Sequence, residues 1–269
     1  MSRALRERER AEQRVLGALR CVDATSLVPV TGPLALTGEG VDLIRNRSGL
    51  YVIRTWTRLA DHASAFPAPP PQPPLGSELL ELSVQDPADR YLPRLARLAL
   101  PRDPRPDHAA DAASLFRPVD VPLYPSPQAP VAANWVVLRV TVRESVSDDV
   151  LGGALLRVVS NGSVLARGLT DWRGEALVPV AGVPVTTWST EPDAVIVTQI
   201  PATLEAVFDP AAGRRTSAAA VRHGAPAPAR PLVDPDAIES ARAGLPQASG
   251  PVLLAAGRSL SVSLQITLP

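Results

Sequence analysis

Hydrophobic and polar residues alternate in many short segments of this chain. Within residues 134–145, valine or leucine occupies every second position from Val136 to Val142. A second regular alternation closes the chain, where Leu260 to Leu268 place an apolar residue at every second position. Successive side chains of a strand point to opposite faces of a sheet, so each segment predicts a strand with one buried face. The sequence therefore predicts a mainly β protein.

Turn-forming residues separate these apolar segments. Asn161-Gly162 lies between two apolar runs, which is the strongest short-range signal for a hairpin. Residues 45–49 predict a turn between two short strands, and Thr170 to Gly174 predict another turn before the apolar segment 175–180. Consecutive hairpins of this kind indicate an antiparallel meander.

The prediction divides the chain into three parts. Residues 1–21 are expected to form an N-terminal helix, because the segment is rich in strong helix formers and contains no proline. Residues 22–130 are expected to form a β-rich region, in which the proline-rich segment 66–76 crosses the surface as a stiff, extended chain. Residues 134–269 are expected to form an antiparallel β-sandwich, interrupted by an irregular insertion at about 211–250.

One short helix is predicted inside this insertion, from Pro235 to Ala243. Asp234 is a suitable N-cap, proline is favoured at the first helical position, and Gly244 is a typical C-terminal stop. The strand 260–268 is then expected to return to the sandwich and complete one of its sheets.

Charge and composition narrow the range of partners. The 27 basic and 27 acidic residues balance, whereas a nucleic-acid-binding protein usually carries a basic excess on one face. No apolar run reaches the roughly 18 to 20 residues that span a bilayer, and the N-terminus has no apolar signal-peptide region. We therefore expect no nucleic-acid or membrane partner, and a cytoplasmic protein.

Residues able to carry chemistry are few and scattered. The single cysteine, Cys21, cannot form an intramolecular disulfide and is expected to be a small buried side chain. His62, His108 and His223 lie in segments rich in proline and alanine, without metal-ligand spacing, and are expected at the surface. The aspartate pair 148–149 is expected to form a plain turn, because a calcium site needs several more oxygen ligands.

Sequence motifs of enzymes are absent as well. The chain has no Gly-x-Ser-x-Gly, His-Glu-x-x-His or glycine-rich phosphate-binding motif. Sequence spacing does not test for a Ser-His-Asp arrangement, because its members can come from distant segments. We expect no catalytic residues, no metal and no cofactor, and therefore a protein that is not an enzyme.

Candidate binding residues lie near the turn Thr170 to Gly174. Trp172 within this turn could anchor a protein partner or stack on a sugar, and Arg173 adjoins it. The alternative is a structural role, in which the Trp172 ring folds over the edge of the sandwich. Trp188 is the third residue that we assign to partner binding.

The segment 153–184 resembles the carboxypeptidase-regulatory-like and transthyretin-like β-sandwich domains. It reads GALLRVVSNGSVLARGLTDWRGEALVPVAGVP and matches their order of strand, Asn-Gly-type turn, strand, Thr-Asp-x-x-Gly and further strand. The end of the chain, LLAAGRSLSVSLQITL, is similar to their last strand after an Ala-Gly turn. The resemblance implies that residues 134–269 form a small β-sandwich of the immunoglobulin or transthyretin-like kind. The zinc ligands of metallocarboxypeptidases lie in a separate catalytic domain, which we do not find in this sequence.

Over about residues 25–269 the chain also resembles accessory proteins encoded beside contractile phage-tail-like particles, such as extracellular injection systems. The resemblance rests on five segments in order, SLVPVTGPLAL, RNRSGLYVI, DPADRYLPRLARLALPRDP, SLFRPVDVPLYPSP and NWVVLRVTV. It implies a non-catalytic structural, assembly or adaptor protein whose partners are sheath, tube or baseplate proteins, or further copies of the chain itself. It also implies that the protein is either free in the cytoplasm or associated with such a particle. A carbohydrate- or cell-surface-binding module is the alternative function.

Overall fold

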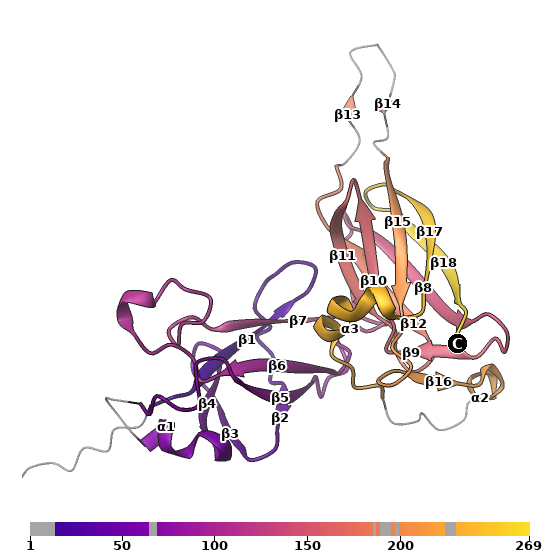
Figure 1. Cartoon of the computed structure of the whole chain (residues 1–269). Helices are drawn as coiled ribbons and strands as arrows, with labels where there is room; N and C mark the ends of the chain where they lie inside the picture. The colour runs from indigo at the N-terminus through magenta and orange to yellow at the C-terminus, as the bar shows by residue number, and fades with distance from the viewer. Residues whose placement is uncertain (1–13, 65–68, 185–186, 189–194, 197–198, 224–229) are drawn as a thin grey trace, which may run out of the picture. The chain divides into compact units, whose positions relative to one another are not determined.

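The computed structural model describes residues 14–64, 69–184, 187–188, 195–196, 199–223 and 230–269, and Figure 1 shows the course of the chain. Strands make up 45% of the protein, several sheets are antiparallel, and the helices are few and short. The prediction of a mainly β protein is confirmed.

Short strands and single-turn helices make up the first 130 residues. Their bounds are β1 (Gly17–Asp23), β2 (Ala35–Thr37), β3 (Val41–Arg45), β4 (Tyr51–Trp56), η1 (Thr57–Leu59), α1 (Ala60–Ser64), β5 (Glu78–Gln85), β6 (Arg94–Leu100), η2 (Pro106–His108) and β7 (Val119–Leu123). The strands form two sheets, one with the strand order β3-β4-β1-β7 and one with the order β2-β5-β6.

Longer strands dominate the rest of the chain. Their bounds, with those of the intervening helices, are β8 (Val136–Glu144), β9 (Val150–Gly152), β10 (Leu155–Ser160), β11 (Ser163–Leu169), β12 (Glu175–Val180), β13 (Thr187–Trp188), β14 (Val195–Ile196), β15 (Ile200–Val207), β16 (Arg214–Thr216), α2 (Ala218–Arg222), α3 (Pro235–Ala241), η3 (Arg242–Gly244), β17 (Gln247–Leu254) and β18 (Ser259–Ile266).

The chain forms two compact units, each made of segments that are separate in sequence. The first unit comprises residues 1–20, 37–81 and 97–120, and the second comprises residues 21–36, 82–96 and 121–269. The sequence predicts three independently folding parts, residues 1–21, 22–130 and 134–269. This division stays a prediction.

A hairpin in the first unit joins β3 to β4. The backbone N–H of Asn46 donates to the carbonyl of Leu50 at 2.9 Å, and the N–H of Leu50 donates to Asn46 Oδ1 at 2.9 Å. Gly49 adopts a φ of 79°, in the left-handed region that glycine enters without steric cost. The predicted turn at residues 45–49 is therefore confirmed.

The predicted N-terminal helix is wrong where the structure describes it. Gly17–Asp23 is strand β1, and it pairs antiparallel with β4, with Gly17 opposite Ile53. Leu19 and Cys21 are both buried, so burial follows a period of two and outweighs the helix propensity of the segment. Residues 1–13 of the predicted helix lie outside the described residues.

Two sheets of the second unit enclose one hydrophobic core. One sheet has the strand order β11-β10-β15-β17, and the other has the order β12-β8-β9-β16, with β18 also paired to β8. The predicted alternation in β8 is confirmed, because the side chains of Val136, Leu138, Val140 and Val142 are at most 2% exposed and lie in this core. Aromatic residues are only 4% of the chain, so aliphatic side chains fill most of the space between the sheets.

The two hairpins predicted in this unit have different outcomes. The Asn161-Gly162 turn does join β10 to β11 in an antiparallel hairpin. The meander is wrong at the next turn, because β12 leaves the sheet of β11 and pairs with β8 instead. Gly168 explains the close crossing, since an added Cβ there would come within 2.7 Å of the Val178 side chain in β12.

The last strand completes the second sheet as the sequence predicts. Leu264 and Ile266 of β18 are buried in the core, while Ser261 and Ser263 on the other face are exposed. Its pairing with β8 is parallel, with Ser259 opposite Val137. The sheet is thus mixed, and the prediction of a wholly antiparallel sandwich is wrong for this strand.

The predicted irregular insertion at about 211–250 is partly wrong. β16 pairs with β9, and β17 begins at Gln247 and pairs along the full length of β15. The short helix is confirmed as α3, and Asp234 caps it by accepting hydrogen bonds from the backbone N–H groups of Asp236 and Ala237. Figure 1 shows α3 beside the sheet that contains β10.

A buried arginine connects three elements of the second unit. The Arg94 side chain is only 1% exposed, and its Nη1 donates to the carbonyl of Pro122 in β7 at 2.9 Å. Its Nη2 donates to Asp236 Oδ2 in α3 at 2.6 Å, and Nε donates to the carbonyl of Leu95 at 2.9 Å. The guanidinium also lies 6.0 Å from the centre of the Tyr124 ring. Arg94 therefore fixes β6, β7 and α3 to one another.

Replacement of Arg94 tests this role. We expect Arg94→Ala to lower the free energy of unfolding by about 3–5 kcal/mol, because it leaves the carbonyls and carboxylate around it without their partner. Arg97→Ala is the matched control on the same strand, since its side chain is 45% exposed and pairs with Glu81 at the surface. The control should cost about 1 kcal/mol or less in urea unfolding. Equal losses for the two variants would contradict the role of Arg94.

Candidate functional site

The turn Thr170–Gly174 is held by buried polar contacts. Asp171 Oδ1 accepts the backbone N–H groups of Arg173 at 2.8 Å and Glu175 at 3.1 Å. Thr170 Oγ1 donates to the carbonyl of Leu151 at 2.7 Å and accepts the N–H of Ala154 at 2.8 Å. Short polar side chains that bond to nearby backbone groups fix tight turns in this way. The backbone that carries Trp172 and Arg173 is therefore fixed on both sides.

A cavity of about 190 Å³ lies beside this turn, within the second unit. Residues from the segments 89–93, 126–128, 169–173 and 230–233 line it, together with Gly153. These segments are held to one another by backbone hydrogen bonds, such as the N–H of Ser126 to the carbonyl of Arg90 at 2.8 Å. The cavity is thus part of the folded framework rather than a gap beside a single loop.

The charged side chains at this cavity pair with one another. Arg230 donates to both carboxylate oxygens of Asp89, with Nη2 at 2.8 Å from Oδ2. Arg173 Nε donates to Asp171 Oδ2 at 3.0 Å. The Arg230 guanidinium holds the pKa of the Asp89 carboxyl below its ordinary value. The wall therefore presents two ion pairs and little net charge.

Two aromatic side chains belong to the same wall. Trp172 is half-buried, and the Arg173 guanidinium lies 5.9 Å from the centre of its ring. The Tyr91 hydroxyl donates to Asp23 Oδ2 at 3.1 Å, and burial raises the pKa of Tyr91 to about 12. Tyr91 is therefore a neutral phenol at any ordinary pH.

The structure brings two of the three predicted binding residues together. Trp172 and Arg173 both line the cavity, whereas Trp188 lies in the two-residue strand β13 and outside the part of the chain whose side chains are described. The sequence analysis missed Tyr91, Ser126 and Arg230, because they come from distant segments with no shared motif. Ser126 is 8% exposed, and its Oγ has no hydrogen-bond partner among the described residues.

Strand β18 presents a second feature, an open hydrogen-bonding edge. The N–H of Val137 donates to the carbonyl of Arg258 at 2.9 Å, and the N–H of Ser145 donates to the carbonyl of Ile266 at 3.0 Å. In a parallel ladder alternate residues bond to the same neighbour, so the even-numbered residues of β18 bond to β8. Within the described chain, four odd-numbered residues direct backbone N–H and C=O groups away from β8 without a partner strand: Ser259, Ser261, Ser263 and Gln265.

The outer strands of the neighbouring sheet differ from β18. β17 contains Pro251, which lacks an N–H, and β11 contains Arg167. Proline and charged residues on an outer strand hinder the addition of a further strand. β18 reads SLSVSLQI and contains neither. Among the outer strands β11, β17 and β18, the edge of β18 is therefore the most accessible to strand addition.

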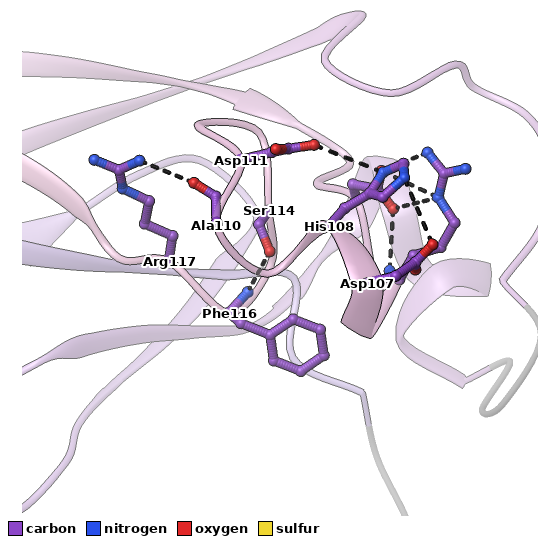
Figure 2. A network of polar contacts seen from close by, with 9 residues as sticks. Asp107, His108, Ala110, Asp111, Ser114, Phe116 and Arg117 are labelled. Carbon is purple, nitrogen blue, oxygen red and sulfur yellow. Dashed lines mark hydrogen bonds and ion pairs between the residues drawn. The ribbon is translucent and has the colours of Figure 1, made fainter.

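His108 belongs to a polar network in the first unit, which Figure 2 shows from close by. Its Nδ1 lies 2.8 Å from Asp103 Oδ2, and Arg105 Nη2 donates to the same oxygen at 2.7 Å. Asp107 and Asp111 each lie 3.7 Å from a ring nitrogen of His108. Arg105 lowers the pKa of the Asp103 carboxyl. In the described part of the chain, no group of three or more His, Cys, Asp or Glu side chains is arranged to hold a metal ion.

The remaining candidate residues have structural surroundings. His62 is 5% exposed, so its expected surface position is wrong, because α1 buries it together with Ala63; burial lowers the pKa of His62. His223 is exposed, and its Nδ1 lies 2.7 Å from the carbonyl oxygen of Ala219. Cys21 is buried as expected, and burial raises the pKa of its thiol to about 12.

The aspartate pair 148–149 forms the expected turn between β8 and β9. Asp148 Oδ2 accepts from Arg143 Nη1 at 2.8 Å, and Asp149 Oδ2 accepts from Arg215 Nε at 2.7 Å. Both carboxylates are thus occupied by arginine. None of the helices among the described residues has the length and hydrophobicity needed to cross a membrane.

Comparison of the chain with models of protein families, with curated proteins and with solved structures gave no match. The resemblances to carboxypeptidase-regulatory-like domains and to accessory proteins of phage-tail-like particles therefore stay predictions.

Two glycines test how firmly the turn at the cavity is fixed. Gly174 and Gly162 have φ values of 70° and 76°, but only Gly174 is crowded, since an added Cβ would lie 2.6 Å from the carbonyl oxygen of Val142. We expect Gly162→Ala to cost roughly 1–2 kcal/mol, the strain of a left-handed residue. Gly174→Ala should cost about 1–3 kcal/mol more through overpacking. The measurement is urea unfolding of both variants, and an equal cost would show that the turn yields freely.

Proposed function

We propose that this chain is a non-catalytic adaptor protein that binds other proteins by adding a strand at the open edge of β18. The observation that carries this proposal is the row of four outward N–H and four outward C=O groups on a strand with no charge and no proline. An extended peptide that pairs with such an edge gains main-chain hydrogen bonds, and its side chains contact the two faces of the sheet.

The sheets and the cavity of the second unit also support a binding role. Its two facing sheets agree with the carboxypeptidase-regulatory-like β-sandwich that segment 153–184 resembles, and we propose that the unit is such a domain. The carboxylates of Asp89 and Asp171 at the cavity are each engaged by an arginine, and Tyr91 stays protonated. The pKa of Asp89 is lowered and that of Tyr91 is raised, so neither group is suited to act as a general base near neutral pH, which favours binding over acid–base chemistry.

The resemblance of five segments to accessory proteins of contractile phage-tail-like particles supplies the expected setting. We propose sheath, tube or baseplate proteins of such a particle as the partners. Tail-like particles are assembled from repeated contacts between protein subunits, and strand addition joins chains through backbone groups that every partner possesses. The setting rests on the resemblance, whereas the mode of binding rests on β18.

Substitution of one outward residue tests the mode of binding. Ser261→Pro removes an N–H that faces away from β8, so the ladder inside the protein stays intact. We expect the tagged full-length variant to lose at least nine tenths of its capture of sheath, tube or baseplate proteins, as quantified by mass spectrometry. Ser261→Ala keeps the N–H and is the matched control, which should capture as the unsubstituted protein does.

Two results would overturn the proposal. Equal capture by Ser261→Pro and Ser261→Ala would show that the edge of β18 is not the contact. If the unsubstituted protein captures no sheath, tube or baseplate protein, the proposal that it acts in a phage-tail-like particle is wrong. Circular dichroism and thermal unfolding of both variants verify that they are folded.

A further inference from the structure

The cavity beside the turn Thr170–Gly174 shares no residue with β18, so it is independent of strand addition. Its volume of about 190 Å³ is below the roughly 300–1,000 Å³ of sites for drug-sized ligands. A single ring-sized group matches this volume better than a length of peptide. The walls are rigid, because backbone hydrogen bonds join Leu92 to Tyr124 at 2.9 Å and Gly153 to Thr170 at 2.9 Å.

The charge of the walls selects against an ionic ligand. Asp89 is paired with Arg230, and Asp171 is paired with Arg173, so an anion or a cation would have to displace one member of an existing pair. A neutral polar group can instead share these side chains, accepting from a guanidinium and donating to a carboxylate without breaking the pair. The cavity therefore favours a neutral ligand with several hydroxyl groups.

The remaining wall residues supply two further features of a sugar site, an aromatic surface and additional hydrogen-bonding groups. Trp172 and Tyr91 supply aromatic surface, against which the apolar C–H face of a sugar ring can pack. Gln128 is an exposed residue that lines the cavity, and its amide offers both a donor and an acceptor. Ser126 lies in the wall, and its Oγ is a polar group that no described residue satisfies. Buried polar groups usually have a partner, so this hydroxyl is an unused group at the cavity.

A peptide fits these surroundings less well. The backbone N–H groups of Leu92, Ser126, Gly153 and Thr170 are already bonded within the protein. The side chains of the wall carry hydroxyl, amide, guanidinium and carboxylate functions, which match the alternating donors and acceptors of sugar hydroxyls. From these observations we infer that the cavity binds one neutral sugar ring of a glycan, with Trp172 as its stacking surface.

Binding of simple glycosides to the full-length protein tests the inference. The probes are the methyl glycosides of glucose, galactose, mannose and N-acetylglucosamine, each titrated while saturation-transfer NMR is recorded. We expect saturable binding of at least one glycoside, with a dissociation constant on the order of 1 mM, which corresponds to about −4 kcal/mol. Methyl glucuronide, the anionic counterpart, should bind no more tightly than the neutral probes.

Matched variants connect the binding to the cavity. Trp172→Ala should raise the dissociation constant at least tenfold, while Trp172→Phe, which keeps an aromatic face, should recover most of the affinity. Trp135→Phe is the control outside the cavity wall and should bind as the unsubstituted protein does. Thermal unfolding of each variant verifies that it is folded.

Failure of this inference is separable from failure of the proposed function. Absence of saturable binding by all four neutral glycosides, or unchanged binding by folded Trp172→Ala, would overturn the sugar site. Ser261→Pro should bind glycoside normally, and Trp172→Ala should capture particle proteins normally. A Trp172→Ala variant that loses capture of particle proteins but binds glycosides unchanged would show that the cavity receives a protein side chain instead.

Discussion

The buried guanidinium of Arg94 is the constraint on which the second unit depends. A charge removed from water is costly unless the protein supplies hydrogen-bond partners in the right geometry. Those partners are the carbonyl oxygens of Leu95 and Pro122 and the carboxylate of Asp236. They come from segments that lie far apart in sequence, so satisfying one side chain fixes β6, β7 and α3 together. The walls of the cavity follow from this arrangement, because Tyr91 to Pro93 lead directly into β6 and Val233 leads into α3.

A second arginine contacts α3 through an ion pair. Arg157 of β10 is paired with Glu205 of β15 and lies 3.0 Å from Glu239 of α3. Arg242 reaches the same glutamate at 3.2 Å. Ion pairs such as these account for some of the 27 basic and 27 acidic residues of the chain. Ile238 of α3 is buried in a hydrophobic cluster with Tyr124 and Leu155, and the ion pairs supply an additional attachment for the helix.

The sequence allowed those elements to be predicted whose causes are local. β8, β18 and the Asn161-Gly162 hairpin follow from alternation and turn chemistry, and α3 follows from the Asp234 cap. The errors occurred where distant segments decide the outcome. Residues 18–20 are good helix formers, yet pairing with β4 makes them part of a strand. The crossing of the chain after Gly168 depends on Val178 in the opposite sheet. The cavity joins four separate segments and Gly153, and only Thr170 to Arg173 of its wall lay in a recognisable turn.

The composition of β18 is not explained by folding alone. Its inward residues Leu264 and Ile266 complete the core, so the strand cannot be replaced without loss of stability. Packing in the core does not constrain Ser259, Ser261 and Ser263 of β18, because their side chains are exposed. Lysine or arginine at any of these positions would protect the edge without disturbing the core. The chain has 27 basic residues and places none of them in this strand, although Arg167 lies in the outer strand β11. An unprotected edge on an otherwise protected pair of sheets is the arrangement expected of a surface that accepts another strand.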